Sequence, residues 1–208
     1  MEKKQIIFAT ANEDKMNEIR MILADLGMEV ISLKDAGIHT DIVEDGETFE
    51  ENAVIKAETI MKETGMITLA DDSGLEVDRL NKEPGVYSAR YCGRDTSYRI
   101  KNRNILERLT DVPDEERTAR FVCAVALAIP GGIVEGVESD TVVTVRGTME
   151  GRIGYEENGE HGFGYDPIFF LPEYDCYSAE LLPEKKNEIS HRGKALRKMK
   201  KVLEGYGI

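Results

Sequence analysis

Apolar residues near the start of the chain recur first with the period of a strand and then with that of a helix. Residues Gln5 to Ala9 form a short apolar run, which predicts a strand. From Lys15 to Leu26 the apolar residues recur every three or four positions, which predicts a helix. The apolar face of that helix consists of Met16, Ile19, Ile22, Leu23 and Leu26. A strand, a loop and a helix are therefore expected in this order.

A second helix and a second strand are predicted next. Thr48 and Glu51 have capping-box spacing, and the helical period that follows continues until Gly65. Met66 to Ala70 has the apolar character of a buried strand. We expect this strand to end in an acidic turn at residues 71–74, with extended chain resuming beyond it.

The second half of the chain is richer in strands. A helix is predicted over Ser97–Leu109, and two segments rich in Val, Ala and Thr, 117–129 and 133–147, predict an antiparallel hairpin around Pro130-Gly131-Gly132. A short strand at 168–171 and a helix at 193–203 follow. Helices and strands alternate early and long strands pair later, so we expect an α/β protein with a mixed sheet, as one domain over residues 1–208.

Composition narrows the range of partners. The 208 residues carry a net charge of −13, so no nucleic-acid partner is expected, because a negative surface repels a polyanion. The three cysteines form no CxxC pair, which argues against a disulfide framework or a zinc site and favours a cytoplasmic location. The apolar stretch Cys123–Ile129 is too short to cross a bilayer, and no export signal is expected.

The loop between the first strand and the first helix is a candidate phosphate site. Backbone N–H groups at the start of a helix have no partner within it and can bind an anion. An ordinary capped helix with a surface lysine is the alternative interpretation. The loop lacks the glycines of a Walker loop or a dinucleotide fingerprint. Its residues are Thr10, Ala11, Asn12, Glu13, Asp14 and Lys15.

Adjacent carboxylates are the second candidate. Asp71 and Asp72 follow an apolar strand, where they can bind a cation, act as bases or cap a turn. Neighbours in a strand point to opposite sides, so we expect only one of them to face a ligand, and the residues alone leave open which. Glu44, Asp45 and Glu47 precede the second helix and could supply further oxygen ligands, although acids there are also favoured by the helix dipole.

A third candidate region lies near the end of the chain. The stretch from Gly162 to Pro167 combines glycines, two aromatic residues and a carboxylate, which suits stacking on a base and hydrogen bonding to its edge. A glycine-rich turn with aromatic core residues is the alternative. Lys186, His191 and Arg192 add donors for phosphates or a purine keto oxygen, though a lone histidine is usually structural.

Together these segments resemble the inosine triphosphate pyrophosphatase family, and the resemblance covers nearly the whole chain. Any one match could arise by chance, but all occur in the expected order. The matching runs are Thr10-Ala11-Asn12-Glu13-Asp14-Lys15, Thr48-Phe49-Glu50-Glu51-Asn52-Ala53, Ala70-Asp71-Asp72-Ser73-Gly74-Leu75, Pro84-Gly85-Val86-Tyr87-Ser88-Ala89-Arg90-Tyr91, Gly162-Phe163-Gly164-Tyr165-Asp166-Pro167-Ile168-Phe169 and Ile189-Ser190-His191-Arg192-Gly193.

The resemblance implies a two-lobed α/β fold around a long mixed sheet flanked by helices, with a nucleotide cleft between the lobes. It implies a Mg²⁺-dependent homodimer that hydrolyses dITP, ITP and XTP to the monophosphate and pyrophosphate and so removes deaminated purines from the nucleotide pool. It assigns Asp72 as the catalytic base and Glu44 with Asp72 as the metal ligands, with Glu47 as the alternative to Glu44. The implied substrate-binding residues are Thr10, Ala11, Asn12, Glu13, Asp14, Lys15, Ser73, Phe163, Gly164, Tyr165, Asp166, Lys186, His191 and Arg192.

One departure and three rival functions qualify this picture. Ala11 stands where the family often has glycine, so a loop needing positive φ there would contradict the phosphate assignment. Donors at the purine 6-position reject adenine but not guanine, so a further contact near the 2-position is implied. The rivals are the septum-inhibitor-like pyrophosphatases that prefer modified pyrimidines, a nucleotide-binding protein without turnover, and a metal-independent phosphatase.

Overall fold

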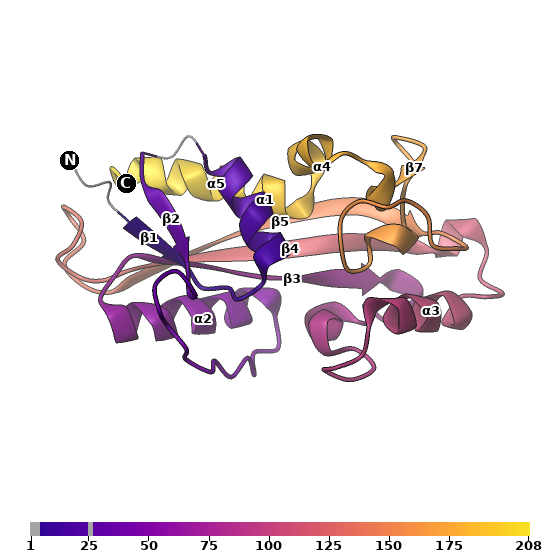
Figure 1. Ribbon diagram of the computed structural model, residues 1–208, viewed down its shortest axis with the longest axis horizontal. Helices are drawn as coiled ribbons and strands as arrows, with labels where there is room; N and C mark the ends of the chain where they lie inside the picture. Colours follow the sequence, from indigo (N-terminus) through magenta and orange to yellow (C-terminus); the bar gives the residue numbers. More distant parts are fainter. Residues whose placement is uncertain (1–4, 25–26) are drawn as a thin grey trace. The chain divides into compact units, whose positions relative to one another are not determined.

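The computed structural model describes residues 5–24 and 27–208 and has a mixed sheet with helices on its faces (Figure 1). The elements are β1 (Gln5–Phe8), α1 (Glu13–Ile22), β2 (Glu29–Ser32), α2 (Phe49–Thr64), β3 (Thr68–Val77), α3 (Tyr98–Arg108), β4 (Thr118–Ile129), β5 (Thr141–Ile153), β6 (Phe169–Leu171), β7 (Cys176–Tyr177), α4 (Pro183–Ile189) and α5 (His191–Gly205). The seven strands follow the order β2-β1-β3-β4-β5-β6-β7. β1 pairs in parallel with β2 and β3, whereas β6 pairs antiparallel with β5 and β7, which confirms the predicted mixed α/β class.

The chain divides into two compact units, neither of them continuous in sequence. The first unit contains Met1–Asp72, Cys123–Gly147 and Arg192–Ile208. The second contains Ser73–Val122 and Thr148–His191. Strands β3, β4 and β5 each contribute residues to both units.

The first unit has helices on both faces of its strands. In Figure 1, α1 and α5 lie on one face and α2 on the other. The core on the α1 and α5 side includes Phe8, Met16, Leu69, Val125 and Leu196, all of which are buried. Because β4 is covered on both faces, every residue from Phe121 to Ile129 is buried, and its sequence is continuously apolar rather than alternating.

Helix α2 has well-defined signals at both ends. The Thr48 side chain accepts a hydrogen bond from the Glu51 N–H, and the Glu51 side chain accepts one from Thr48, which completes the predicted capping box. At the other end Gly65 adopts a left-handed conformation with φ of 66°. The predicted start and end of this helix are therefore confirmed.

The second unit has its own core, around Leu75, Ile105, Phe121 and Ile153. Arg117 is buried there and donates from its guanidinium to backbone carbonyls, including those of Ile153 and Gly154. A buried arginine can satisfy several main-chain acceptors at once because its donors are held in a planar fork.

Three predicted elements had wrong boundaries. α1 begins at Glu13 rather than Lys15 because Asn12 caps it, and it ends at Ile22, while Leu26 lies outside the described residues. β3 continues through residues 71–74, so the predicted acidic turn is absent from this described segment. The hairpin connection is longer than predicted, since β5 begins only at Thr141.

Near the end of the chain, α5 begins at His191, so His191 and Arg192 are its first residues rather than donors that precede it. The short helix α4 was not predicted. Over the described part of the chain, no helix combines the length and the apolar character that crossing a bilayer requires.

Candidate functional site

Asp71 and Asp72 lie in the middle of β3, next to the loop that follows β1. β1 and β3 are in parallel register, with Phe8 opposite Leu69, so the loop that leaves β1 begins beside the β3 residues that precede Asp71. Both aspartates are buried, and their carboxylates meet different partners because successive side chains of a strand point to opposite faces. β3 can remain a strand here because each carboxylate has cationic partners, which the predicted turn did not take into account.

The Asp71 carboxylate binds two cations. It lies 3.1 Å from Lys15 Nζ and 3.3 Å from Arg192 Nη2, and Arg192 also pairs with Glu18. Burial by itself raises the pKa of Asp71, but the charges of Lys15 and Arg192 outweigh it and hold that pKa well below its usual range. The Cys123 thiol lies 3.9 Å from this carboxylate, and burial raises its pKa to about 12. Asp71 is therefore a permanently ionised anchor for two cations.

The Asp72 carboxylate contacts residues of α2, and its pKa is shifted in the opposite direction to that of Asp71. Its Oδ1 lies 3.2 Å from Lys56 Nζ, and its Oδ2 accepts a hydrogen bond of 3.3 Å from Asn52. Burial raises the pKa of Asp72, and the charges of Lys56 and Lys15 offset this only in part. A carboxylate with a raised pKa is better suited to accept a proton than an ordinary one.

Lys56 joins Asp72 to Glu44. The Glu44 carboxylate lies 2.6 Å from Lys56 Nζ, on the same ammonium group that Asp72 contacts. Burial lowers the pKa of Lys56, but Asp72, Asp71 and Glu44 outweigh it, so the net shift is upward and the ammonium stays charged.

The predicted metal ligands Glu44 and Asp72 lie on either side of Lys56 Nζ. Glu44 and Asp72 converge on one cationic centre, and hard oxygen donors of this kind suit Mg²⁺. The exposed Glu47 instead lies in the capping turn, where its N–H donates to Glu51. Within residues 5–24 and 27–208 no group of three or more His, Cys, Asp or Glu side chains converges on a metal position. Two carboxylates are compatible with Mg²⁺, which commonly takes its other ligands from water and substrate phosphates.

The loop from Thr10 to Lys15 is built as a helix cap. Asn12 Oδ1 accepts from the Lys15 N–H at 3.0 Å, and Thr10 Oγ1 accepts from the Asn12 N–H at 3.2 Å. The backbone N–H groups of Glu13 and Asp14 have no hydrogen-bond partner among the described residues. The loop is thus both a capped helix start and a source of free donors.

The departure at Ala11 causes no strain. Among the described non-glycine residues, positive φ occurs at Asn81, Lys82, Cys92 and Asp175, and not at Ala11. The φ at position 11 therefore gives no ground against the phosphate assignment of this loop.

In the second unit, Asp166 connects the glycine-rich loop to α4. Its Oδ1 accepts from Ser178 at 2.8 Å, and its Oδ2 accepts from the Phe163 N–H at 2.8 Å and from Lys186 Nζ at 2.7 Å. Asp166, Ser178 and Lys186 are all buried. This network fixes the carboxylate and closes the loop from Gly162 to Asp166.

The two aromatic residues of this loop differ in exposure. Phe163 is half-buried, with Lys186 Nζ 4.9 Å from its ring centroid. Tyr165 is only 3% exposed, and its hydroxyl donates to the Ser88 carbonyl. Phe163 therefore has a ring that a base could reach, whereas the Tyr165 ring belongs to the core.

Three further predicted site residues are His191, Ser73 and Arg192. His191 is buried and stacks on Phe121, with ring centroids 4.9 Å apart. Ser73 is half-buried and follows Asp72 in β3. Arg192 is buried in the first unit on Asp71 and Glu18.

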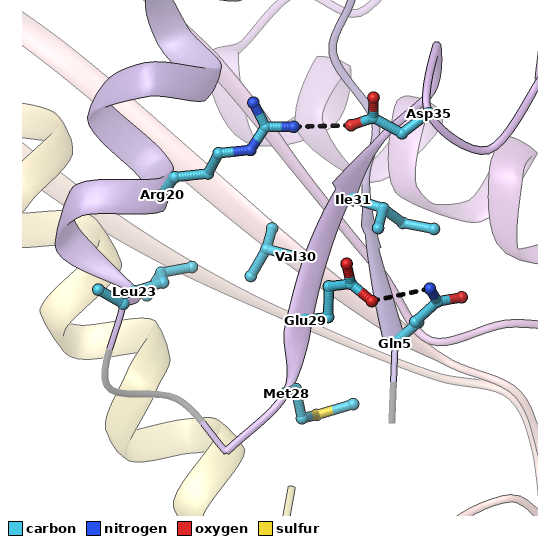
Figure 2. A pocket seen from close by; sticks show the side chains of 9 residues that line it. Gln5, Arg20, Leu23, Met28, Glu29, Val30, Ile31 and Asp35 are labelled. Carbon is cyan, nitrogen blue, oxygen red and sulfur yellow. Dashed lines mark hydrogen bonds and ion pairs between the residues drawn. The ribbon is translucent and has the colours of Figure 1, made fainter. Parts of the chain in front are cut away.

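A separate hollow of about 600 Å³ lies between α1 and β2 (Figure 2). Arg20 and Asp35 form an ion pair beside it, and Gln5 donates to Glu29. None of the sequence-predicted site residues lines it.

Sequence reasoning missed three residues of the Asp71 and Asp72 clusters: Lys56, Asn52 and Glu18. Lys56 and Asn52 are four residues apart on α2, one helical turn, so they share a face. Polar residues within the otherwise apolar face of a predicted helix were the available signal.

The fold and these clusters define an α/β protein with paired carboxylates and lysines beside a strand–loop–helix unit. The Ham1 family model matches residues 6–202, and the chain belongs to the Ham1 family. It is 48% identical over 201 residues to a dITP/XTP pyrophosphatase of Bacillus licheniformis, covering 97% of this chain and 98% of the relative. The corresponding protein of Bacillus subtilis is 45% identical, with the same coverage.

Solved structures agree in fold. The Ham1 protein of Staphylococcus aureus matches with a TM-score of 0.84 and 39% identity, covering 97% of this chain and 99% of that one. A dITP/XTP pyrophosphatase of Mycobacterium abscessus matches with a TM-score of 0.74 and 41% identity, covering 94% and 98%.

Proposed function

We propose that this chain is a nucleoside triphosphate pyrophosphatase. Its substrates are dITP, ITP and XTP, and its products are the monophosphate and pyrophosphate. Full-length similarity to relatives named dITP/XTP pyrophosphatase supports the reaction and the substrate class. The observation within this chain that carries the proposal is the environment of Asp72. This buried carboxylate has a raised pKa and pairs with Lys56, which also pairs with Glu44.

Asp72 acts as the general base in this proposal. Its carboxylate accepts a proton from the water that attacks the α-phosphorus, while the bond from that phosphorus to the bridging oxygen breaks and pyrophosphate leaves. Asn52 and Lys56 hold the carboxylate oriented through its two oxygens. Such orientation matters because an attacking water and its base must be aligned before the reaction.

Glu44 and Asp72 are the proposed ligands of a Mg²⁺ ion. When bound, the ion supplies positive charge that neutralises the triphosphate. Lys56 lies at the centre of these carboxylates and limits their mutual repulsion when no divalent cation is bound.

The proposed triphosphate donors are Lys15 and the free N–H groups of the Thr10 loop. Lys15 Nζ is held by Asp71 at 3.1 Å, which orders the long side chain before a substrate arrives. Preorganised donors of this kind stabilise developing charge without reorganisation and are typically worth several kcal/mol.

The proposed base-binding residues in the second unit are Phe163, Gly164, Asp166, Lys186 and His191. Phe163 offers a half-buried ring for stacking. Donors directed at the 6-position match the keto oxygen of hypoxanthine or xanthine, whereas the amino group of adenine leaves a donor unsatisfied. Arg192 remains the other predicted reader of the keto edge.

The assembly and location complete the proposal. We expect a homodimer in the cytoplasm, where deaminated purine nucleotides arise and compete for incorporation into DNA and RNA. Size-exclusion chromatography with light scattering distinguishes a dimer from a monomer directly.

The test is incubation with ITP, dITP, XTP, ATP and GTP, with and without Mg²⁺, with nucleotide products, pyrophosphate and orthophosphate measured separately. Monophosphate with stoichiometric pyrophosphate, from the deaminated purines and only with metal, is expected. Diphosphate with orthophosphate, activity in EDTA, or binding without turnover would each refute the proposal. A modified pyrimidine triphosphate in the same assay detects the septum-inhibitor-like preference.

A further inference from the structure

Asn102 is a buried amide on α3 that contacts the glycine-rich loop of the second unit. The residue is 2% exposed. Its Nδ2 donates to the Gly164 carbonyl at 3.3 Å and to Glu157 Oε1 at 3.0 Å. One side chain therefore joins α3 to two points of the connection that follows β5.

The two partners dictate which way the amide points. Both are acceptors, so only Nδ2 can face them, and the amide cannot be flipped without losing both hydrogen bonds. Oδ1 is then buried, with no hydrogen-bond partner among the described residues. An orphan acceptor costs stability, so a leucine would suit this position better if packing were its only purpose.

The neighbouring residues of α3 make contacts of other kinds. Tyr98, one helical turn earlier, packs edge-on against Tyr165, with ring centroids 5.2 Å apart. Gly164 has φ of 69°, and a Cβ there would lie 3.5 Å from the Tyr98 ring. Lys101 donates to the Ala89 carbonyl rather than to the loop. Among the interactions described, the hydrogen bond from Asn102 to the Gly164 carbonyl is thus the one that joins α3 to loop 162–166.

We propose that Asn102 is a positioning residue that fixes the Gly164 carbonyl and, through it, the orientation of loop 162–166 for purine binding. This inference rests on the proposed function, because it assigns to the loop the role of holding the base. Asn102 itself does not touch the substrate. Phe163 precedes Gly164 in the chain and donates its N–H to Asp166, so a displaced Gly164 carbonyl changes the backbone that orients the Phe163 ring.

The kinetic consequence is specific. A residue that positions the base contributes to binding in the ground state and the transition state alike, so its loss raises KM and leaves kcat nearly unchanged. A purely structural residue would instead reduce the fraction of folded enzyme, which lowers the apparent kcat at constant KM.

The experiment compares Asn102→Leu with Asn104→Leu in full-length protein, using ITP with Mg²⁺. Asn104 lies on the same helix and accepts a hydrogen bond from the Tyr91 hydroxyl, away from the loop. We expect Asn102→Leu to raise KM roughly three- to tenfold, with kcat within about twofold and a melting temperature at or above that of the wild type. Asn104→Leu should leave KM unchanged.

An unchanged KM in Asn102→Leu, beside an active wild type, overturns the inference and leaves the proposed function intact. An inactive wild type refutes the proposed function itself. If Asn102→Leu does not fold, Asn102→Ser is measured in its place together with amide hydrogen exchange of residues 162–166. Faster exchange in the loop with a raised KM supports the inference, and wild-type values of either one overturn it.

Discussion

Asp71 and Asp72 are adjacent in β3, yet their carboxylates serve different cations and have opposite pKa shifts. Asp71 pairs with Lys15 and Arg192, and its pKa is held low, whereas Asp72 pairs with Lys56 and its pKa is raised. Successive side chains of a strand point to opposite faces, so Asp71 can hold two cations while its neighbour Asp72 serves as the proposed base. Parallel substitutions at the two positions should therefore have different effects.

Replacement of Asp72 by asparagine should abolish most turnover. Loss of a general base typically costs roughly 10²- to 10⁴-fold in kcat, while ITP binding should be largely retained. The raised pKa means that the ionised carboxylate is less favourable in the folded chain than in water, so Asp72→Asn should lower the free energy of unfolding less than Asp71→Asn does. Steady-state kinetics, calorimetric binding and urea unfolding measure these effects, and near-normal kcat would remove Asp72 from the role.

Replacement of Asp71 by asparagine should primarily destabilise the fold. Lys15 and the buried Arg192 would lose their shared counter-charge, and breaking a buried ion pair from one side costs about 3 kcal/mol or more. Urea unfolding of Asp71→Asn beside Asp72→Asn provides the matched comparison. Equal stability of the two variants would contradict the anchor role of Asp71.

Replacement of Gly162 by alanine should displace the Asp166 carboxylate. Gly162 has φ of 76°, and a Cβ there would clash with Asp166 Oδ2. The control is Gly132→Ala, because Gly132 has a similar φ of 79° but no heavy atom within 4 Å of an added Cβ. Both variants carry backbone strain, but only Gly162→Ala should raise the KM for ITP, by about tenfold if it costs one hydrogen bond to a charged group. Equal KM values in the two variants would exclude a role for Asp166 in substrate binding.

Stability at low pH should depend on Asp78. Arg120 donates to both its oxygens, at 2.9 and 3.1 Å, and these hydrogen bonds hold the pKa of Asp78 below its usual range. The contribution of the ionised Asp78 to the free energy of unfolding is complete above the unfolded pKa of about 3.9. It is lost as the pH falls through the lower pKa of the folded state. Asp78→Asn should therefore be less stable than wild type at pH 7, with the difference shrinking below about pH 4. Urea unfolding across this range measures the effect, and a stability difference that does not shrink at low pH would contradict it.

Much of the fold could be predicted because local signals were strong. The Thr48 capping box and Gly65 defined α2, and apolar runs located β1 and the hairpin strands. The error at residues 71–74 arose because Asp, Ser and Gly favour turns locally. Here distant cations neutralise the carboxylates, and tertiary contacts override the local preference.

The candidate site was predictable only in part, for a related reason. Motifs located Asp72, Glu44 and the Thr10 loop, but nothing local to Lys56 indicates that its ammonium lies between two carboxylates. Such a cluster is created by strand register and helix packing, which bring residues 12 and 16 positions apart together. Likewise, the burial of the Tyr165 ring follows from its contact with α3, which sequence spacing does not reveal.

The interleaving of the two units constrains how this protein can be divided or recombined. Each unit draws on segments separated by parts of the other, with the chain crossing at β3, β4, β5 and the start of α5. No single cut in the gene separates them, and no uninterrupted fragment encodes either one completely without part of the other. A single deletion or exchange of one continuous segment therefore cannot remove one unit completely and leave the other whole.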